Sequence, residues 1–173
     1  MKKKLLAITA VVALSGLFYS VYADALNKAI AHVVLNLTDK GLPLTITVPD
    51  GIEAKGTSKT YYGTTEKTVT LKKDKFQMEI STTSDNDNNE DPLEDIVAQN
   101  QRLHSAGSNF VKIEESFPGG YIFKTNYSNK DDYDFFYALI KDGKVYTFHT
   151  GNAMISYTLD EVKTMAASAR SAK

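Results

Sequence analysis

The chain has 173 residues, no cysteine and a formal net charge of −1. Without cysteine it can form neither a disulfide scaffold nor a lipid anchor on a cysteine. The near-neutral charge argues against nucleic acid and anionic lipid as main partners, because both are recognised through basic patches.

The N-terminal residues have the three parts of a secretory signal peptide. Lys2, Lys3 and Lys4 precede an apolar run, and Val21-Tyr22-Ala23 fits a cleavage site. The alternative is an uncleaved anchor, since the run is just long enough to span a bilayer. The cleavage site favours secretion or a periplasmic location, with no stable membrane insertion. We predict a signal peptide over residues 1–23 and a single domain over residues 24–173, whose net charge falls from −1 to −4 with the loss of the three lysines.

The first part of the mature chain predicts a strand with a clear inner face. We interpret residues 24–40 as a short helix or turn entering a strand, with an edge strand over 33–38 as the alternative. Residues 42–48 then alternate between apolar and polar side chains, which predicts a strand. Its inner face carries Leu42, Leu44, Ile46 and Val48. Pro49-Asp50-Gly51 should end this strand as a turn.

A long connection and a hairpin are expected next. Residues 52–65 are rich in Gly, Thr, Ser and Lys, which predicts a connection with room for a short strand near Tyr61-Tyr62. The hairpin has strands at 66–72 and 75–82. Its alternation places Phe76, Met78 and Ile80 inside and Gln77, Glu79 and Ser81 toward solvent.

A helix with a clear start follows an acidic loop. Asp91 is its expected N-cap, with Pro92 at the first helical position and Glu94 at the third. An apolar stripe of Leu93, Ile96, Val97 and Leu103 predicts one buried face. His104 lies in the last turn, where a cation suits the helix dipole. Gly107 should follow the end of the helix.

Residues 109–150 predict a four-stranded antiparallel meander. Its last hairpin, 132–150, contains Asp142-Gly143, which suits a two-residue type I′ turn. That turn fixes a register in which Leu139 faces Tyr146 and Phe136 faces His149. Both faces of the hairpin are mostly apolar, so it should lie at the centre of the sheet, covered on both sides.

A final helix is predicted from Leu159 to about Ser171. Thr158 and Glu161 form a capping box at its start. Because hairpins link the strands, the sheet is antiparallel and the fold class is α+β. We expect a twisted antiparallel sheet of about six to seven strands with two main helices packed on it.

This order of elements resembles the PsbP-like fold. The resemblance rests on the opening strand Thr45-Ile-Thr-Val-Pro-Asp-Gly51, the hairpin–helix–meander–helix order, and a meander that ends in Gly143-Lys-Val-Tyr-Thr-Phe148. The chain lacks the Trp often found just after the opening Pro in such domains. The resemblance implies an accessory or assembly factor that binds a larger complex rather than an enzyme. It assigns no functional residue.

The acidic loop before the first helix is the best metal candidate. Its oxygen ligands for Ca²⁺ would be Asp85, Asp87, Asn89 and Asp91. An EF-hand loop starting at Asp85 needs Gly at the sixth position and Glu at the twelfth, where the chain has Glu90 and Ile96. The mismatch favours a solvated loop that precedes the helix. We therefore expect no cofactor, with Ca²⁺ as the alternative.

No catalytic motif is present. There is no G-x-S-x-G elbow, and no two of the three histidines stand at a metal-ligand spacing. His149 is expected to be a packed or surface histidine. Tyr61 and Tyr62 are the candidate binding residues, because exposed tyrosines favour recognition and connections carry function more often than scaffolds. The sequence thus predicts an exported, non-catalytic domain that binds a protein or cell-envelope component. The alternative is a small-molecule or Ca²⁺-binding periplasmic protein.

Overall fold

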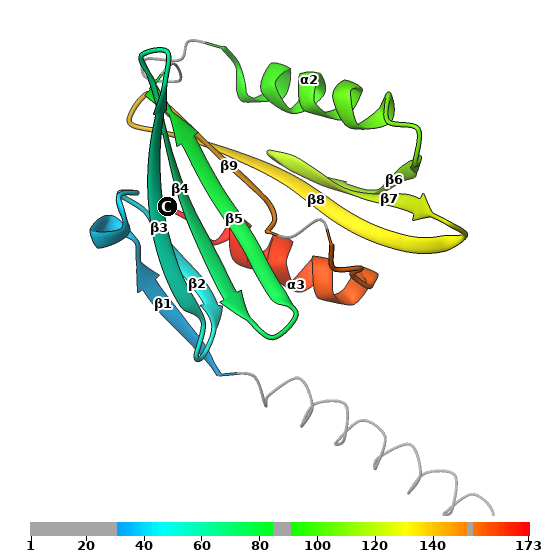
Figure 1. Ribbon diagram of the computed structural model, residues 1–173, viewed down its shortest axis with the longest axis horizontal. Helices are drawn as coiled ribbons and strands as arrows, with labels where there is room; N and C mark the ends of the chain where they lie inside the picture. The colour runs from blue at the N-terminus through cyan, green and yellow to red at the C-terminus, as the bar shows by residue number, and fades with distance from the viewer. Residues whose placement is uncertain (1–30, 85–90, 152–153) are drawn as a thin grey trace, which may run out of the picture.

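The computed structural model describes residues 31–84, 91–151 and 154–173. In this part of the chain, a seven-stranded antiparallel sheet has the strand order β3-β4-β5-β9-β8-β7-β6, and β1 and β2 form a separate two-stranded sheet. Two long helices, α2 and α3, lie on opposite faces of the larger sheet (Figure 1). The expected α+β class and antiparallel sheet are confirmed. The predicted signal peptide, residues 1–23, lies outside the described residues.

The small sheet covers one face of the large one. β1 (His32–Asn36) pairs with β2 (Thr45–Pro49), and the 3-10 helix η1 (Thr38–Lys40) lies between them. A strand at 33–38 was one of the two interpretations of this region. The predicted inner face of residues 42–48 is confirmed, because all four of its apolar side chains are buried. Thr45 and Lys173 exchange two backbone hydrogen bonds of 3.0 and 3.1 Å, which tie the C-terminus to β2.

The predicted connection over residues 52–65 is wrong. It forms the nine-residue edge strand β3 (Glu53–Tyr61), which pairs along its whole length with β4 (Thr64–Lys73). Tyr62 and Gly63 make the turn between them, with φ values of 51° and 89°. β3 is exposed over most of its length, so it carries no apolar alternation to mark it as a strand. Backbone pairing with β4 holds it instead.

The predicted hairpin at 66–82 is confirmed with one correction. β5 (Phe76–Thr83) pairs with β4 on one side and with β9 on the other. Gln77, which we expected in solvent, is only 6% exposed. Its side-chain Nε2 donates to the carbonyl of Asp74 at 3.2 Å, and its backbone carbonyl accepts from the N–H of Gly151 at 2.7 Å. These contacts with the β4–β5 turn and with the residue after β9 are not revealed by strand alternation.

Helix α2 (Leu93–Ser105) starts and packs differently from the prediction. Its N-cap is Pro92 rather than Asp91, with extended backbone angles and no side-chain capping bond. Leu103, expected on the buried stripe, is 65% exposed. None of the residues of α2 is buried, whereas α3 (Leu159–Arg170) buries five. α2 is thus the more loosely packed of the two helices.

The predicted meander is confirmed. It consists of β6 (Phe110–Phe117), β7 (Gly120–Tyr127), β8 (Lys130–Lys141) and β9 (Lys144–Thr150). Asp142 and Gly143 have φ values of 52° and 72°, as a type I′ turn requires. Both predicted pairs, Leu139 with Tyr146 and Phe136 with His149, are present. β8 and β9 lie in the middle of the sheet.

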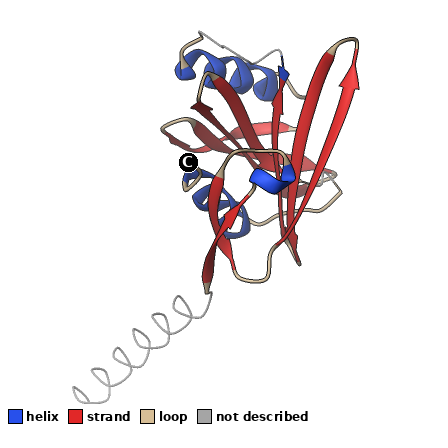
Figure 2. Cartoon of the chain, turned by 90° about the vertical axis from the view of Figure 1, so that its left-hand side faces the viewer, coloured by secondary structure: helices blue, strands red, loops and turns tan. Residues whose placement is uncertain are grey.

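Helices lie on either side of the sheet (Figure 2), and a hydrophobic core lies on each of its two faces. The larger core lies between the sheet, α3 and the β1–β2 hairpin, and it includes Phe135. The smaller core lies under α2 and contains Tyr121, Phe123, Phe136 and Ala138. The capping box of α3 is confirmed, since Glu161 N donates to Thr158 Oγ1 and Thr158 N donates to Glu161 Oε2. Across the described ranges, no helix has the length and hydrophobicity needed to cross a membrane.

Candidate functional site

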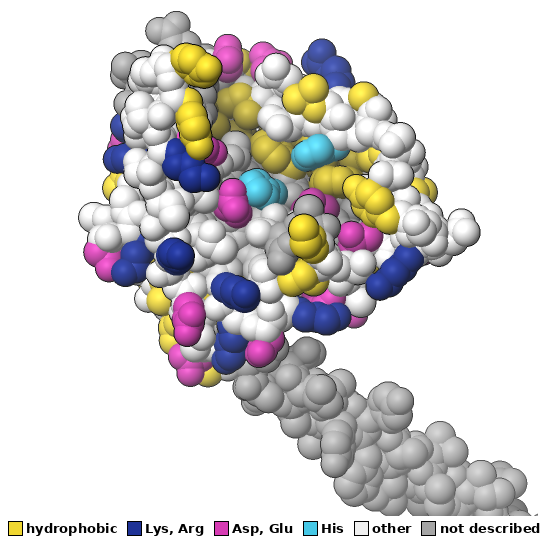
Figure 3. Space-filling model, in the orientation of Figure 1, with side chains coloured by type: hydrophobic (Ala, Val, Ile, Leu, Met, Phe, Trp, Pro, Cys, Tyr) yellow, Lys and Arg dark blue, Asp and Glu magenta, His cyan; other side chains and the backbone are white. Residues whose placement is uncertain are grey.

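A cleft opens on the α2 side of the sheet, next to the smaller core. It lies between the C-terminal end of α2, strands β6 to β9 and the segment that precedes α3, and it has a volume of about 360 Å³. Apolar and histidine side chains surround a hollow on this face of the molecule (Figure 3). We call it the α2–sheet cleft.

Aromatic residues form part of the wall of the α2–sheet cleft. On the α2 face they are Phe110 of β6 and Phe123 and Tyr127 of β7, so the fold rather than one motif assembles them. Tyr133 and Tyr157 also line the cleft, but their side chains belong to the larger core on the opposite face. Two lining residues, Leu103 and Tyr127, are respectively 65% and 54% exposed and offer apolar surface at the opening.

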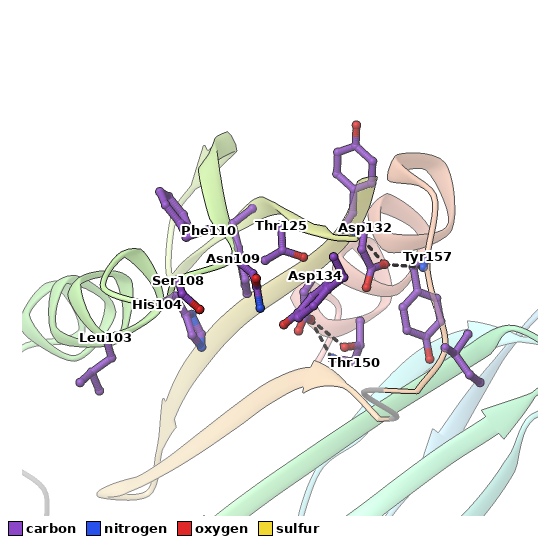
Figure 4. Close-up of a pocket in the computed structure, with 15 residues that line it drawn as sticks. Leu103, His104, Ser108, Asn109, Phe110, Thr125, Asp132, Asp134, Thr150 and Tyr157 are labelled. Carbon is purple, nitrogen blue, oxygen red and sulfur yellow. Dashed lines mark hydrogen bonds between the residues drawn. The ribbon is translucent and has the colours of Figure 1, made fainter. Parts of the chain in front are cut away.

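Asp134 is the carboxylate with the most hydrogen bonds in the cleft. It lies on β8 opposite Phe123, which places it on the α2 face of the sheet. Its Oδ1 accepts from Phe135 N at 2.7 Å. It also accepts from Thr150 Oγ1 at 2.8 Å and from Thr150 N at 3.2 Å (Figure 4). Burial raises the pKa of Asp134, although these hydrogen bonds and the His149 charge act in the opposite direction. The carboxyl thus ties β8 to β9 at an electrostatic cost.

Asp132 lines the cleft two residues earlier on the same face of β8. Its Oδ1 accepts from Tyr133 N at 2.9 Å and from Tyr157 N at 2.6 Å (Figure 4). It therefore fixes the segment before α3 against the sheet. The Tyr157 side chain is 3% exposed, and its hydroxyl is buried without a hydrogen-bond partner in the described structure. Burial, together with the charges of Asp134 and Asp132, raises the pKa of Tyr157 to about 12.

His104 forms the cleft wall on the side of α2. Its ring stacks on Phe123 with a centroid distance of 4.6 Å, and its Nδ1 lies 2.7 Å from the Tyr121 hydroxyl. Burial lowers the pKa of His104, and the charge of His149 lowers it further. The expectation that His104 acts as a cation at the helix end is therefore corrected. It is instead a neutral ring that attaches the end of α2 to the sheet.

We predict that the pKa of His104, followed by NMR of the imidazole Cε1 proton, lies below its ordinary value of 6.5. Replacing His149 by Gln should raise this pKa, because it removes a nearby positive charge. Since the unfolded chain binds more protons than the folded one as the pH falls below 6.5, protonation of His104 should lower the stability in acid. A His104 midpoint at or above 6.5 would contradict this description of the cleft wall.

The other polar groups on this face do not form a metal or nucleophile site. His149 Nε2 lies 3.8 Å from Glu79 Oε1, and its Nδ1 lies 2.8 Å from the carbonyl of Thr150. No group of three or more His, Asp or Glu side chains suited to a metal ion occurs among the described residues. In the same part of the chain, neither His104 nor His149 is hydrogen-bonded to a Ser or Thr hydroxyl. The arrangement can bind and orient a ligand, but it lacks a paired base and nucleophile.

The residues singled out from the sequence lie elsewhere. Tyr61 and Tyr62 are 57% and fully exposed at the tip of the β3–β4 hairpin, rather than in a long connection. They line none of the described clefts, and their role in binding stays a prediction. Asp85, Asp87 and Asn89 lie outside the described residues. Asp91 is described and exposed just before α2.

A pocket between sheet and helix was an alternative from the sequence, but sequence reasoning assigned no residue to it, because its walls come from distant segments. One signal was available. Asp132 and Asp134 interrupt the start of a strand that continues as Phe135-Phe136-Tyr137-Ala138, at the centre of the sheet. A carboxylate there needs either buried hydrogen-bond partners or a functional reason.

The sequence matches no family model, and none of the curated proteins matches it.

Proposed function

We propose that this chain is an exported, non-catalytic binding domain that recognises a protein or cell-envelope component through the α2–sheet cleft. The cleft is the observation that carries the proposal. It combines aromatic walls with a few hydrogen-bonding groups, which is the usual composition of a ligand site. The exposed side chains of Leu103 and Tyr127 at its opening supply apolar contact area for a partner.

The lack of a paired nucleophile and base in the described cleft supports binding rather than catalysis. The signal-peptide pattern of residues 1–23 supports export to the periplasm or the cell exterior. The net charge of −4 expected after cleavage makes nucleic acid an unsuitable partner, because the phosphate backbone is bound by basic surfaces.

The finer assignment to the PsbP-like fold is also a proposal. Its support is the order of five strands (β1 to β5), a helix, a four-stranded meander and a closing helix in the described chain. The resemblance implies that this chain is an accessory or assembly factor of a larger complex, which agrees with a binding role.

A small-molecule-binding periplasmic protein is the second candidate, and the size of the cleft favours it. A volume of about 360 Å³ is near the lower end of the range for small-ligand sites, about 300–1,000 Å³. Binding of Ca²⁺ through the acidic loop stays a prediction, since Asp85, Asp87 and Asn89 lie outside the described residues.

A tryptophan placed in the cleft should abolish binding without unfolding the domain. Ser108 is exposed and lines the cleft, whereas Ser105 is also exposed but does not line it. Both substitutions to Trp should change the stability by less than about 0.5 kcal/mol, because they lie at the surface. We expect envelope extract to raise the thermal midpoint of the parent protein and of Ser105→Trp, but not that of Ser108→Trp. A ligand at about a hundred times its Kd adds roughly 2.7 kcal/mol, which is readily detected.

The same measurement separates the candidate functions. A rise with macromolecules retained by ultrafiltration supports a protein or envelope partner, and a rise with the filtrate supports a small molecule. A rise with Ca²⁺ alone would support the acidic loop. If Ser108→Trp keeps the full response, the cleft is not the binding site. No response to any fraction would contradict the binding proposal.

A further inference from the structure

The α2–sheet cleft contains two carboxyl groups that have no ion-pair partner among the described residues. Asp132 and Asp134 both line it, and no described Lys or Arg does. Neither carboxylate takes part in an ion pair with a described residue, whereas neighbouring Asp131 is paired with Lys124 at 2.7 Å. The histidine on the cleft wall, His104, is held in its neutral form by burial.

The hydrogen bonds of both carboxylates use only one oxygen. The donors from Phe135 and Thr150 all reach Oδ1 of Asp134, and those from Tyr133 and Tyr157 both reach Oδ1 of Asp132. No donor from the described residues reaches either Oδ2 atom. An asparagine could accept the same bonds through its amide oxygen. The structural role thus explains an acceptor at position 134, but it does not explain a charge there.

An organic cation suits these surroundings better than a metal ion. The described carboxylates and histidines form no group of three that could hold a metal. The wall is partly aromatic instead, since Phe110, Phe123 and Tyr127 line the same cleft as the two carboxylates. Aromatic faces attract ammonium and guanidinium groups, most strongly when these are partly desolvated.

We propose that the α2–sheet cleft binds an organic cation, an ammonium or guanidinium group, with Asp134 and Asp132 as its counter-charges and the surrounding aromatic rings as its walls. This inference rests on the proposed function, because it takes the cleft to be the binding site. Such a group can belong to a free amine or to a Lys or Arg side chain of a partner protein. The two sources share the same chemistry in the cleft.

The test compares a cation with a neutral molecule of the same shape. Choline and 3,3-dimethylbutan-1-ol differ in the charged nitrogen, and N-acetyl-lysine amide and N-acetyl-arginine amide represent the side chains. Binding of each to the purified exported protein is measured by NMR titration. We expect at least one cation to bind about ten times more tightly than the neutral alcohol, which corresponds to about 1.4 kcal/mol.

Asp134→Asn should weaken binding of the cation about tenfold while keeping the Oδ1 acceptor. The matched control is Asp142→Asn, which removes the same charge from the exposed β8–β9 turn, where Asn is well tolerated. This control should leave the affinity unchanged. A general effect of net charge would weaken binding equally in both variants and would overturn the proposal.

The remaining outcomes identify the source of the cation and test whether the ligand is a cation at all. A lysine- or arginine-containing peptide that binds ten times more tightly than the isolated amide identifies a protein partner, whereas equal affinities identify a free amine. If choline and the alcohol bind equally, or if no cation binds, the inference of a cationic ligand is wrong. The proposed function would still stand if Ser108→Trp abolished the response to envelope extract, so the two failures are distinguishable.

Discussion

Replacing Phe135 by alanine is expected to lower the free energy of unfolding by about 3–5 kcal/mol. Phe135 is fully buried in the larger core, on the face of β8 that packs against α3. The neighbouring elements are held from several sides, so they cannot close the cavity that the ring leaves. For a domain of this size, the loss should lower the thermal midpoint by roughly 6–20 °C, which calorimetry measures directly.

The adjacent Phe136 provides the comparison. It points to the smaller core under α2, and α2 has no buried residue of its own. The helix can therefore move inward and fill part of the space, so we expect Phe136→Ala to cost less than Phe135→Ala. A larger loss from Phe136→Ala would show that the α2 face carries most of the stability, contrary to the packing described above.

The elements that could be predicted from the sequence are those whose boundaries or register depend on a short local motif. The Asp142-Gly143 turn set the register of β8 and β9 correctly, because only one strand alignment follows from a two-residue type I′ turn. The capping box at Thr158 and Glu161 located the start of α3 for a similar reason. Strand β3 was missed because its pairing with β4 needs no apolar face.

The cleft could not be predicted, because burial at its residues depends on contacts between distant segments. His104 reads as a cation at a helix end, yet the ring of Phe123 stacks on it and its pKa falls. No local pattern marks Asp134 as buried, yet Thr150 donates two hydrogen bonds to it. Neither contact is visible from spacing along the chain. Tyr61 and Tyr62 were singled out because the polar residues around them predicted exposure, which depends on local sequence alone, and both are exposed.

Removing the side-chain oxygens of Asp134 should be far more harmful than removing its charge. In Asp134→Ala the N–H of Phe135 and both donors of Thr150 lose their acceptor. We expect this to lower the free energy of unfolding by about 2–4 kcal/mol, since unsatisfied buried groups are costly. Asp134→Asn keeps an acceptor at the same place and should be at least as stable as the parent at neutral pH. Urea denaturation of the three proteins measures both effects.

The pH dependence of these stabilities tests the charge itself. Because the pKa of Asp134 is raised above its ordinary value of 3.8, the folded chain holds a proton that the unfolded chain has released. The free energy of unfolding of the parent protein should therefore fall as the pH rises from 3.8 to the raised pKa of Asp134, and it should stay lower at higher pH. Asp134→Asn lacks this loss, so its advantage over the parent should be near zero at about pH 3 and grow toward neutrality. A constant difference across this range would mean that ionisation of Asp134 is not costly in the folded protein. The predicted pattern would mean that the carboxylate lowers the stability of the domain at neutral pH, a cost that a bound cation would offset.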